Sequence, residues 1–310
     1  MVSFSIVRAL FQFWTMTGGF YGRFIKSISI LLILSLSLGL GATALASTFI
    51  DAHGNEVELD ETLEANSEVT LYGGNNAARM EETNLGDLWT DALLWFATSG
   101  KISEYYDEDD IAAGNTGIAV DADHVVALWN GGNLREDIPA GTFGAEELAL
   151  VLPYPNQVAV AYMTGAQLLE TLEAASQGLP CTEDSADACA SFMQVAGLRY
   201  TVDTTQAYDA GEAYGDYWYK ANSINRVNIT EVNGQPFDET ATYAVITSNA
   251  NFNGMDSSYV FVDAVAANET STITTAVVRD VVWMYIEEVL ENNVGSEYEA
   301  AQGRIEIIEG

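Results

Sequence analysis

Apolar residues recur at helical spacing between residues 85 and 96, and this pattern predicts an amphipathic helix. Thr83 and Asn84 directly precede the segment and can cap its first turn. Continuous apolar runs of strand length predict two buried strands, at residues 124–129 and 157–163.

The second half of the chain shows the same mixture of patterns. The sequence Thr164-Gly165-Ala166-Gln167 has the form of a capping box, so a helix is expected to begin there and continue through Ala175. Apolar positions at helical spacing predict one long helix over residues 272–290. Two strands are expected around the turn-forming pair Asn233-Gly234, at residues 226–232 and 243–248. Helices and strands in irregular order, with a late hairpin, indicate an α+β fold rather than a doubly wound sheet.

The first 46 residues differ in composition from the rest. They contain basic residues but no carboxylate, and an apolar run ends in Ala44-Leu45-Ala46, the small-x-small pattern that signal peptidase cleaves. Residues 1–46 are therefore interpreted as a signal peptide, starting at Met1 or Met16, and the mature chain as a periplasmic or extracellular protein. An uncleaved membrane anchor is the alternative, because about 18 apolar residues approach the minimum length of a membrane span.

The charge of the chain excludes one broad class of partner. It has 45 Asp and Glu against 11 Lys and Arg, a formal net charge of -34. Nucleic acids and anionic membranes are bound largely through cations, so neither is an expected partner of the mature chain. A dense carboxylate surface is typical of proteins that stay soluble at high salt. Because 48% of the residues are hydrophobic, the chain can still bury a core.

Two further features bear on chemistry. Cys181 and Cys189 lie in a polar stretch, and export would place them in an oxidising compartment, so a local disulfide is expected rather than a catalytic thiol. His53 lies in the sequence Asp51-Ala52-His53-Gly54-Asn55, which resembles a metal-ligand cluster only superficially. A turn between two short strands is the interpretation that we adopt for it.

Four short segments carry the residues most suited to ligand binding. A loop of Asn and two glycines after a strand lets the backbone approach a ligand closely, and an arginine can grip a carboxylate or phosphate with two N–H groups. Taken singly, each segment also fits an ordinary turn, a surface ion pair or a core aromatic residue. The segments are Arg79-x-x-Glu82-Thr83-Asn84-Leu85-Gly86, Asn130-Gly131-Gly132-Asn133-Leu134-Arg135, Leu152-Pro153-Tyr154 and Gly254-Met255-Asp256.

In order and spacing these segments resemble the C-terminal domain of the 5'-nucleotidase family, secreted nucleotide hydrolases that also include UDP-sugar hydrolases and cyclic-nucleotide phosphodiesterases. The resemblance runs from about Val69 to Arg304 and includes the sequence Phe192-Met193-Gln194-Val195-Ala196-Gly197. It implies a single domain of mixed α and β layers over residues 67–310, after an N-terminal extension at 47–66.

The resemblance also implies a set of substrate-binding residues. Arg79 and Arg135 would contact the phosphate and ribose side of a nucleoside or nucleotide such as adenosine or AMP. Asn130, in the loop that contains Gly132, would hydrogen-bond the base. Asp256 would accept hydrogen bonds from the ribose hydroxyls, as a carboxylate can.

The aromatic residues match the family only in part. Tyr154 would stack on one face of the base, where its hydroxyl is the only difference from the family's phenylalanine. The second stacking phenylalanine of the family aligns with Ala250. Phe252, two residues further on, would replace it if the loop shifts.

The catalytic half of the family, an N-terminal metallophosphoesterase domain that uses divalent metals, is not recognised in this sequence. The chain has two histidines, and neither lies in that domain's motifs. No cofactor and no independent hydrolysis are therefore expected. Three hypotheses remain: an exported nucleotide-binding domain with a role in nucleotide catabolism, a substrate-binding component completed by a separate metallophosphoesterase chain, or a scaffold that kept the fold and lost the ligand.

Overall fold

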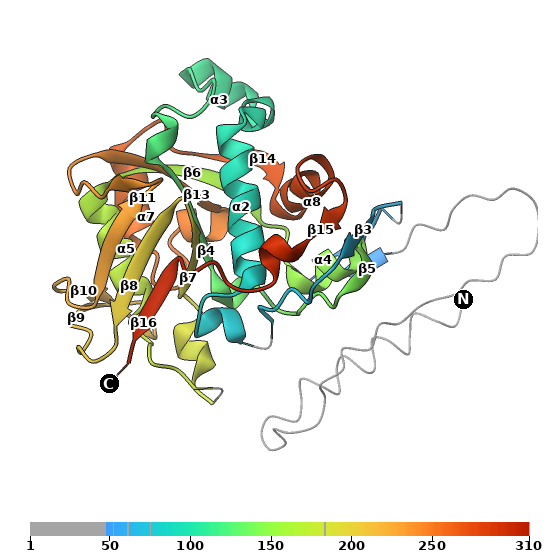
Figure 1. The fold of residues 1–310 in the computed structure, drawn as a ribbon. Coiled ribbons are helices and arrows are strands. Elements are labelled where there is room, and N and C mark those ends of the chain that lie inside the picture. The colour runs from blue at the N-terminus through green and yellow to red at the C-terminus, as the bar shows by residue number, and fades with distance from the viewer. Residues whose placement is uncertain (1–47, 52, 61, 75, 183, 310) are drawn as a thin grey trace, which may run out of the picture. The chain divides into compact units, whose positions relative to one another are not determined.

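A five-stranded mixed sheet, in the order β14-β6-β13-β4-β7, lies at the centre of the molecule (Figure 1). The computed structural model describes residues 48–51, 53–60, 62–74, 76–182 and 184–309, so the predicted signal peptide lies outside the described residues. Strands β4 and β13 are parallel, and the other neighbours are antiparallel. The strands are β4 (Val125–Asn130), β6 (Gln157–Thr164), β7 (Met193–Ala196), β13 (Thr242–Ser248) and β14 (Thr272–Val277).

Alternate side chains of these strands enter two separate cores. In β4, Val125, Ala127 and Trp129 belong to one buried cluster, whereas Val126 and Leu128 belong to another. Because successive side chains of a strand point to opposite faces, a strand with five consecutive apolar residues requires cover on both sides.

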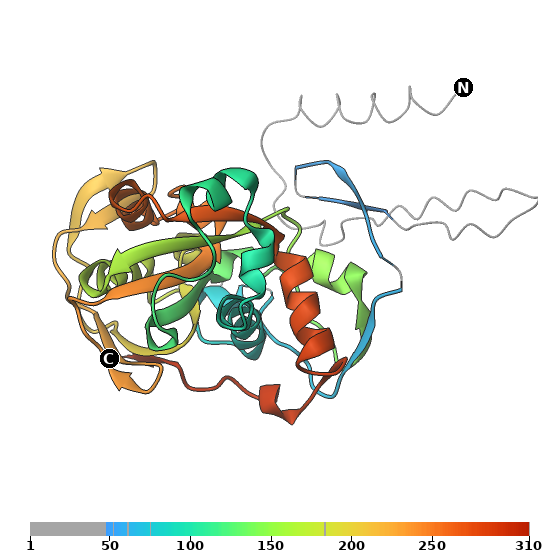
Figure 2. The ribbon, with the colours of Figure 1, turned by 90° about the horizontal axis from the view of Figure 1, so that it is seen from above.

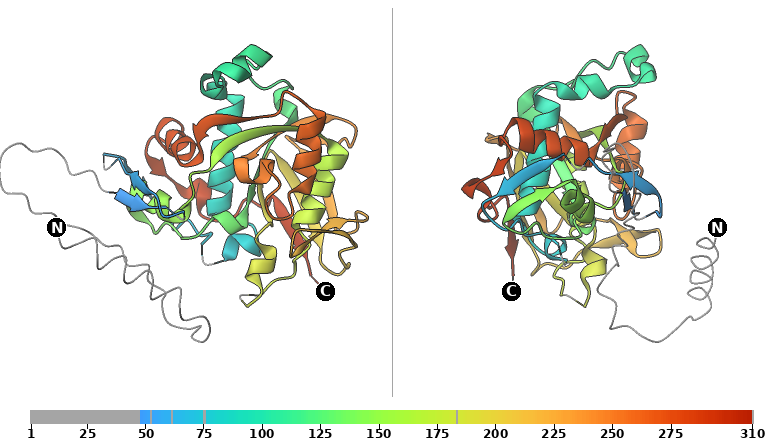
Figure 3. Two further views of the ribbon diagram at one scale, coloured as in Figure 1. Left: turned by 180° about the vertical axis from the view of Figure 1, so that it is seen from behind. Right: turned by 90° about the vertical axis from the view of Figure 1, so that its right-hand side faces the viewer.

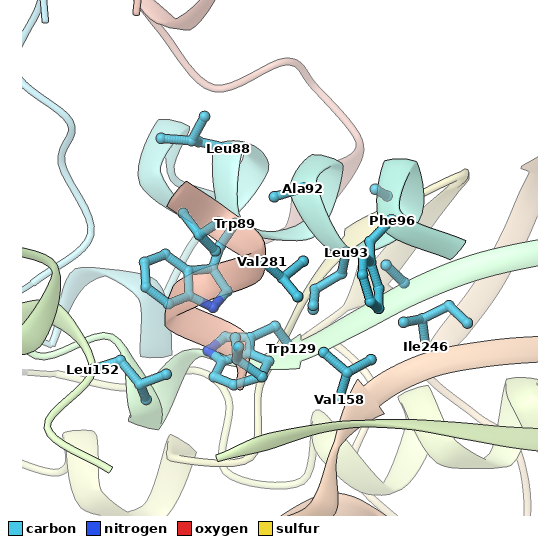
Figure 4. Close-up of a cluster of buried hydrophobic side chains, with 14 of the residues drawn as sticks. Leu88, Trp89, Ala92, Leu93, Phe96, Trp129, Leu152, Val158, Ile246 and Val281 are labelled. Carbon is cyan, nitrogen blue, oxygen red and sulfur yellow. The ribbon is translucent and has the colours of Figure 1, made fainter. Parts of the chain in front are cut away.

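Helices α2 (Asn84–Thr98) and α8 (Val278–Glu288) cover the first face and lie side by side (Figure 2). The core beneath them is rich in large side chains, and Trp89 of α2 meets Trp129 of β4 with ring centroids 6.1 Å apart. Figure 4 shows this core, with labels on Leu88, Trp89, Ala92, Leu93, Phe96, Trp129, Leu152, Val158, Ile246 and Val281.

The second face packs against two helices and a second sheet. The helices are α5 (Gly165–Ala175) and α7 (Tyr259–Ala267). The sheet has four strands, in the order β12-β11-β8-β16, and its last strand runs parallel to β8. These strands are β8 (Leu198–Asp203), β11 (Val227–Val232), β12 (Gln235–Pro236) and β16 (Ile305–Ile308).

The remaining elements lie around these layers. A three-stranded sheet joins β3 (Glu64–Ser67) to β15 (Asn293–Val294) on one side and β5 (Gly141–Gly144) on the other (Figure 3). Two hairpins complete the strands, β1 (Thr48–Ile50) with β2 (Glu56–Glu58) and β9 (Ala210–Tyr214) with β10 (Trp218–Ala221). The short helices are α3 (Glu108–Ala113), α4 (Ala145–Val151) and α6 (Asn249–Phe252).

The α+β fold class and most of the predicted elements are confirmed. The Thr83 side chain accepts a hydrogen bond from the Gly86 N–H and caps α2 as expected. Thr164 and Gln167 form the predicted capping box of α5, which ends at Ala175. The predicted disulfide between Cys181 and Cys189 is present, and His53 lies in the turn between two short strands.

The single long helix predicted over residues 272–290 is wrong. Its first six residues form the edge strand β14, and only Val278–Glu288 are helical. Five of the six residues in β14 are β-branched, so their stiff side chains favour a strand, and hydrogen bonding to β6 stabilises it. The helical spacing of the apolar positions did not reveal this change of structure.

The late hairpin also differs from the prediction. Asn233 and Gly234 have positive φ angles of 47° and 74°, as the two central residues of a tight hairpin turn require. The turn joins β11 to the two-residue strand β12, with Val232 opposite Gln235. The chain then crosses to the central sheet, where it forms β13, so the two strands expected to flank the turn belong to different sheets.

Candidate functional site

The segments singled out in the sequence meet at one end of the central sheet. The parallel strands β4 and β13 end there at Asn130 and Ser248, and the antiparallel strand β6 begins there at Gln157. The loops that follow β4, precede β6 and follow β13 therefore leave the sheet at the same edge. Each of these loops contributes at least one of the predicted ligand-binding residues.

The glycine pair after β4 packs against the protein's own backbone. Gly131 and Gly132 donate their N–H groups to the carbonyls of Phe192 and Ala190, at 2.7 and 2.9 Å. A Cβ added to Gly131 would overlap the carbonyl of Ala78, and one added to Gly132 would lie 2.6 Å from the carbonyl of Ala190. These glycines are needed for close packing within the chain, while contact between Gly132 and a ligand stays a prediction.

Asn130 is the last residue of β4 and is only 2% exposed. Its side-chain oxygen accepts a hydrogen bond of 2.9 Å from the amide nitrogen of Asn133. Asn133 thus fixes the rotamer of Asn130 and leaves the amide nitrogen of Asn130 as the group that can donate to a ligand.

Arg79 lies in the 3-10 helix η1 (Ala77–Arg79), and its side chain is largely buried. Its Nη1 atom donates to the Oδ1 atom of Asp187 at 2.6 Å and to the carbonyl of Ala186 at 3.3 Å. Asp187 belongs to the segment that the disulfide Cys181–Cys189 closes, and its side chain is fully exposed. The cation is therefore held rigidly while its acidic partner remains free to turn towards solvent.

Arg135 and Tyr154 form a contact pair at the surface. The Nη2 atom of Arg135 donates to the Tyr154 hydroxyl at 2.9 Å, and the guanidinium carbon lies 5.4 Å from the ring centroid. The ring of His53 approaches the same tyrosine edge-on, with centroids 5.9 Å apart. A guanidinium and an imidazole thus both border the ring expected to stack on a base.

Asp256 brings a carboxylate into the field of both arginines. It has a positive φ of 55° and is half-buried. Burial raises the pKa of Asp256 above its ordinary value, and the positive charges of Arg79 and Arg135 oppose that rise. Asp256 therefore lies within electrostatic reach of both arginines, although the three residues come from separate parts of the sequence.

Phe252 is not presented at this surface. It is 9% exposed and belongs to the core cluster on the second face of the sheet. Ala250 is half-buried in the same short helix, α6, and Met255 in the following loop is 52% exposed. The aromatic face that the sequence expected from Phe252 is thus directed to packing within the protein.

The sequence did not point to two neighbours of the site, Asp187 and Ala186, and it assigned no role to Asn133, which lies in one of the predicted segments. Asp187 lies between two cysteines that were expected to pair. Its contact with Arg79 spans more than a hundred positions in the sequence, so no local pattern could reveal it.

The arrangement combines two guanidiniums, a carboxylate and one aromatic ring. Such a set can bind a ligand that carries an aromatic ring, hydroxyl groups and an anionic group. Within the described part of the chain there is no group of three or more His, Cys, Asp or Glu side chains placed to hold a metal ion. In the same part, no helix is both long and apolar enough to cross a membrane.

Comparison with known proteins agrees with this picture. A family model for the C-terminal domain of 5'-nucleotidases matches residues 63–263. The chain belongs to this family. The 5'-nucleotidase precursor from Thermus thermophilus has a similar structure, with 26% sequence identity and a TM-score of 0.56 over 80% of this chain and 40% of that one.

Relatives of this 5'-nucleotidase C-terminal domain are longer proteins. The chain is 30% identical over 261 residues to the trifunctional nucleotide phosphoesterase protein YfkN of Bacillus subtilis. This match covers 79% of this chain and 15% of YfkN. It is 29% identical over 182 residues to the cell wall protein Lmo0130 of Listeria monocytogenes, which covers 59% of this chain and 19% of that protein. The chain thus spans a minor part of the curated relatives that it matches.

Proposed function

We propose that this 5'-nucleotidase C-terminal domain is an exported protein that binds a nucleoside or nucleotide. The convergence of Arg79, Arg135 and Asp256 beside the ring of Tyr154 supports the proposal. The chain has only 11 basic residues against 45 acidic ones, so two arginines near one half-buried carboxylate mark an unusual concentration of positive charge. A base stacked on one aromatic face gains about 1 to 3 kcal/mol.

Each of these groups has a distinct part in the proposed complex. Tyr154 stacks on the base, and Asp256 accepts hydrogen bonds from the ribose hydroxyls. A ligand phosphate takes the place of Asp187 at Arg79, because the exposed Asp187 side chain can turn away without breaking the core. Asn130 donates to an acceptor on the base through its amide nitrogen.

The charge of the protein favours ligands with few phosphates. A net charge of -34 repels polyanions, above all at low salt. Adenosine or AMP is therefore a better fit than ATP. The site supplies charge and stacking but, among the described residues, no group of metal ligands, so binding rather than hydrolysis is the activity that we propose for the chain on its own.

A thermal unfolding titration tests this function. The chain from Ser47 to Gly310 is titrated with adenosine and AMP at high salt, with and without a divalent metal. Ligand at about 100 times its Kd stabilises the folded state by about 2.7 kcal/mol, which raises the Tm of a domain of this size by several degrees. The Arg135→Ala variant should lose most of the shift.

Arg199→Ala is the matched control, since it removes the same charge from an exposed ion pair with Glu231 on the second sheet. It should respond to ligand as the unaltered protein does. Absence of a shift with either ligand would favour the scaffold hypothesis. Release of phosphate from AMP by the purified chain would show that it is an enzyme by itself.

A second candidate function is that of a substrate-binding component completed by a separate metallophosphoesterase chain. The matched part makes up 15% of YfkN and 40% of the Thermus protein, so in these relatives it is joined to further residues. Met255 is exposed next to Asp256 and offers an apolar contact beside the site. Hydrolysis of AMP by this chain mixed with a metallophosphoesterase domain, faster than by either one, would support the hypothesis, and rates that merely add would exclude that pairing.

A further inference from the structure

Arg279 carries a buried nitrogen that lacks a hydrogen-bond partner among the residues that the structure describes. It is the second residue of α8 and is half-buried. Its Nη1 atom is buried and has no hydrogen-bond partner among the described residues, and none of their carboxylates lies within 4.0 Å of it. In a chain with 45 acidic residues, a buried guanidinium nitrogen without a partner points to a binding site.

Arg279 lies close to the aromatic ring of the proposed nucleotide site. The N–H of Val278, directly before it, donates to the carbonyl of Asn156 at 2.9 Å, and Asn156 is two residues from Tyr154. The Asn156 side chain is 6% exposed, and its oxygen also has no partner among the described residues. The start of α8, where backbone N–H groups favour anions, thus faces the loop that presents Tyr154.

The turn between β1 and β2 approaches the same place. Asp51 accepts hydrogen bonds from the N–H groups of His53 and Asn55, at 2.9 and 2.7 Å, and from the Asn55 amide at 3.0 Å. The hydrogen bond from the Asn55 N–H, and the other two to a smaller extent, lower the pKa of Asp51. Asp51 is therefore charged at neutral pH. The turn carries the ring of His53 to the edge of Tyr154.

The charge of Asp51 also reaches Arg279. Burial lowers the pKa of Arg279, and the negative charges of Asp280 and Asp51 oppose that change. In the described structure Asp51 makes no hydrogen bond to the guanidinium, since its oxygens are engaged within the turn. It therefore compensates the buried charge from a distance and leaves the Nη1 atom unsatisfied.

We propose that Arg279 forms a second phosphate subsite next to Tyr154, and that Asp51 and His53 partly fill it when no ligand is bound. The ring of His53 then stands where a ligand would approach Tyr154, and the carboxylate of Asp51 substitutes for the ligand's phosphate. A phosphate oxygen supplies the hydrogen bond that Nη1 lacks, and the turn moves aside. The subsite extends the proposed nucleotide-binding function. The identity of its ligand rests on that proposed function, whereas its phosphate chemistry does not.

Inorganic pyrophosphate is the probe that tests the subsite without a base or ribose. Its Kd is measured by calorimetry at one fixed high salt concentration. Arg279→Gln should weaken binding about tenfold, the loss expected for one hydrogen bond to a charged group. Asp51→Asn keeps an oxygen for the turn but removes the competing charge, so it should strengthen binding several-fold. Arg279→Lys, which keeps the charge, should fall between Arg279→Gln and the unaltered protein.

Glu58→Gln is the matched control for charge, because it removes one exposed carboxylate from β2 in the same hairpin and should leave binding unchanged. Equal effects of Asp51→Asn and Glu58→Gln would overturn the proposal, because the net charge alone would then explain them. An Arg279→Gln variant that folds and binds pyrophosphate unchanged would also overturn it, as would the absence of binding in every variant.

AMP separates this inference from the proposed function. One outcome is that Arg135→Ala abolishes AMP binding while Arg279→Gln affects neither ligand. That result would support the nucleotide site and reject the second subsite. Pyrophosphate binding that depends on Arg279, in a protein that ignores adenosine and AMP, would establish a phosphate site and reject the nucleotide assignment.

Discussion

Replacing Arg304 by methionine tests how the end of the chain is fixed to α2. The Nη2 atom of Arg304 lies 2.8 Å from Asp91 and its Nε atom 3.5 Å from Asp87, which is only 1% exposed. Its Nη1 atom donates to the carbonyl of Val195 at 2.9 Å. Removing one partner of a buried ion pair costs about 3 to 5 kcal/mol, because the remaining charge is left without compensation.

The pH dependence of this loss follows from Asp87. Burial raises its pKa from 3.8 to about 8, while the positive charge of Arg304 opposes the rise. Between these two values the folded state holds a proton that the unfolded state has released, so the free energy of unfolding falls as the pH rises through this range. Without Arg304 the pKa of Asp87 rises further, and the loss of stability becomes larger at high pH than at low pH.

Urea unfolding at about pH 5 and about pH 9 measures both effects. Arg304→Met should lose about 3 to 5 kcal/mol at the higher pH and clearly less at the lower one. Asp87→Asn should remove most of the pH dependence, and the double variant should recover part of the stability lost in Arg304→Met. A loss below about 1 kcal/mol at both pH values, or an unchanged pH slope in Asp87→Asn, would refute the reasoning.

Two further predictions concern the site. Gly131→Ala should destabilise the fold by about 3 kcal/mol, at the upper end of overpacking costs, because the added Cβ would overlap the carbonyl of Ala78. Urea unfolding measures this loss of stability. A change below about 0.5 kcal/mol would contradict the observed packing. If Asp256 accepts hydrogen bonds from ribose, adenosine affinity should fall as the pH is lowered through its raised pKa, at a higher pH than for an ordinary aspartate. Calorimetry should find weak and pH-independent binding in Asp256→Asn, and an unaltered pH profile in that variant would argue against this role.

The central sheet and its main helices could be predicted because local and tertiary preferences agree there. In α2 the capping residue Thr83 and the apolar spacing point to the same structure, and β4 is apolar enough to be buried on both faces. At residues 272–277 the two signals conflict. The apolar spacing fits a helix, whereas the β-branched residues and the open edge of β6 favour the strand that forms.

The site was predictable only where a residue lies in a recognisable segment. The segments containing Arg79, Arg135 and Asp256 have distinctive order and spacing, and the structure brings these residues into one electrostatic environment. Asp187 and Arg279 lie in no such segment, and their relation to the site depends on how distant loops pack. Phe252 shows the converse, since the sequence alone could not reveal that its ring points into the core.

The pairing of early and late strands constrains when this domain can fold during synthesis. Strand β3 pairs with β15, more than two hundred residues further along the chain, and β8 pairs with β16, about a hundred residues further along. Neither pair can form on the ribosome until nearly the whole domain has emerged. Contacts of such long sequence separation also slow folding, because the entropy of closing a long loop is lost before the contact stabilises the fold. We therefore expect this domain to complete its folding late, with one edge of β3 and one edge of β8 unpaired until β15 and β16 are present.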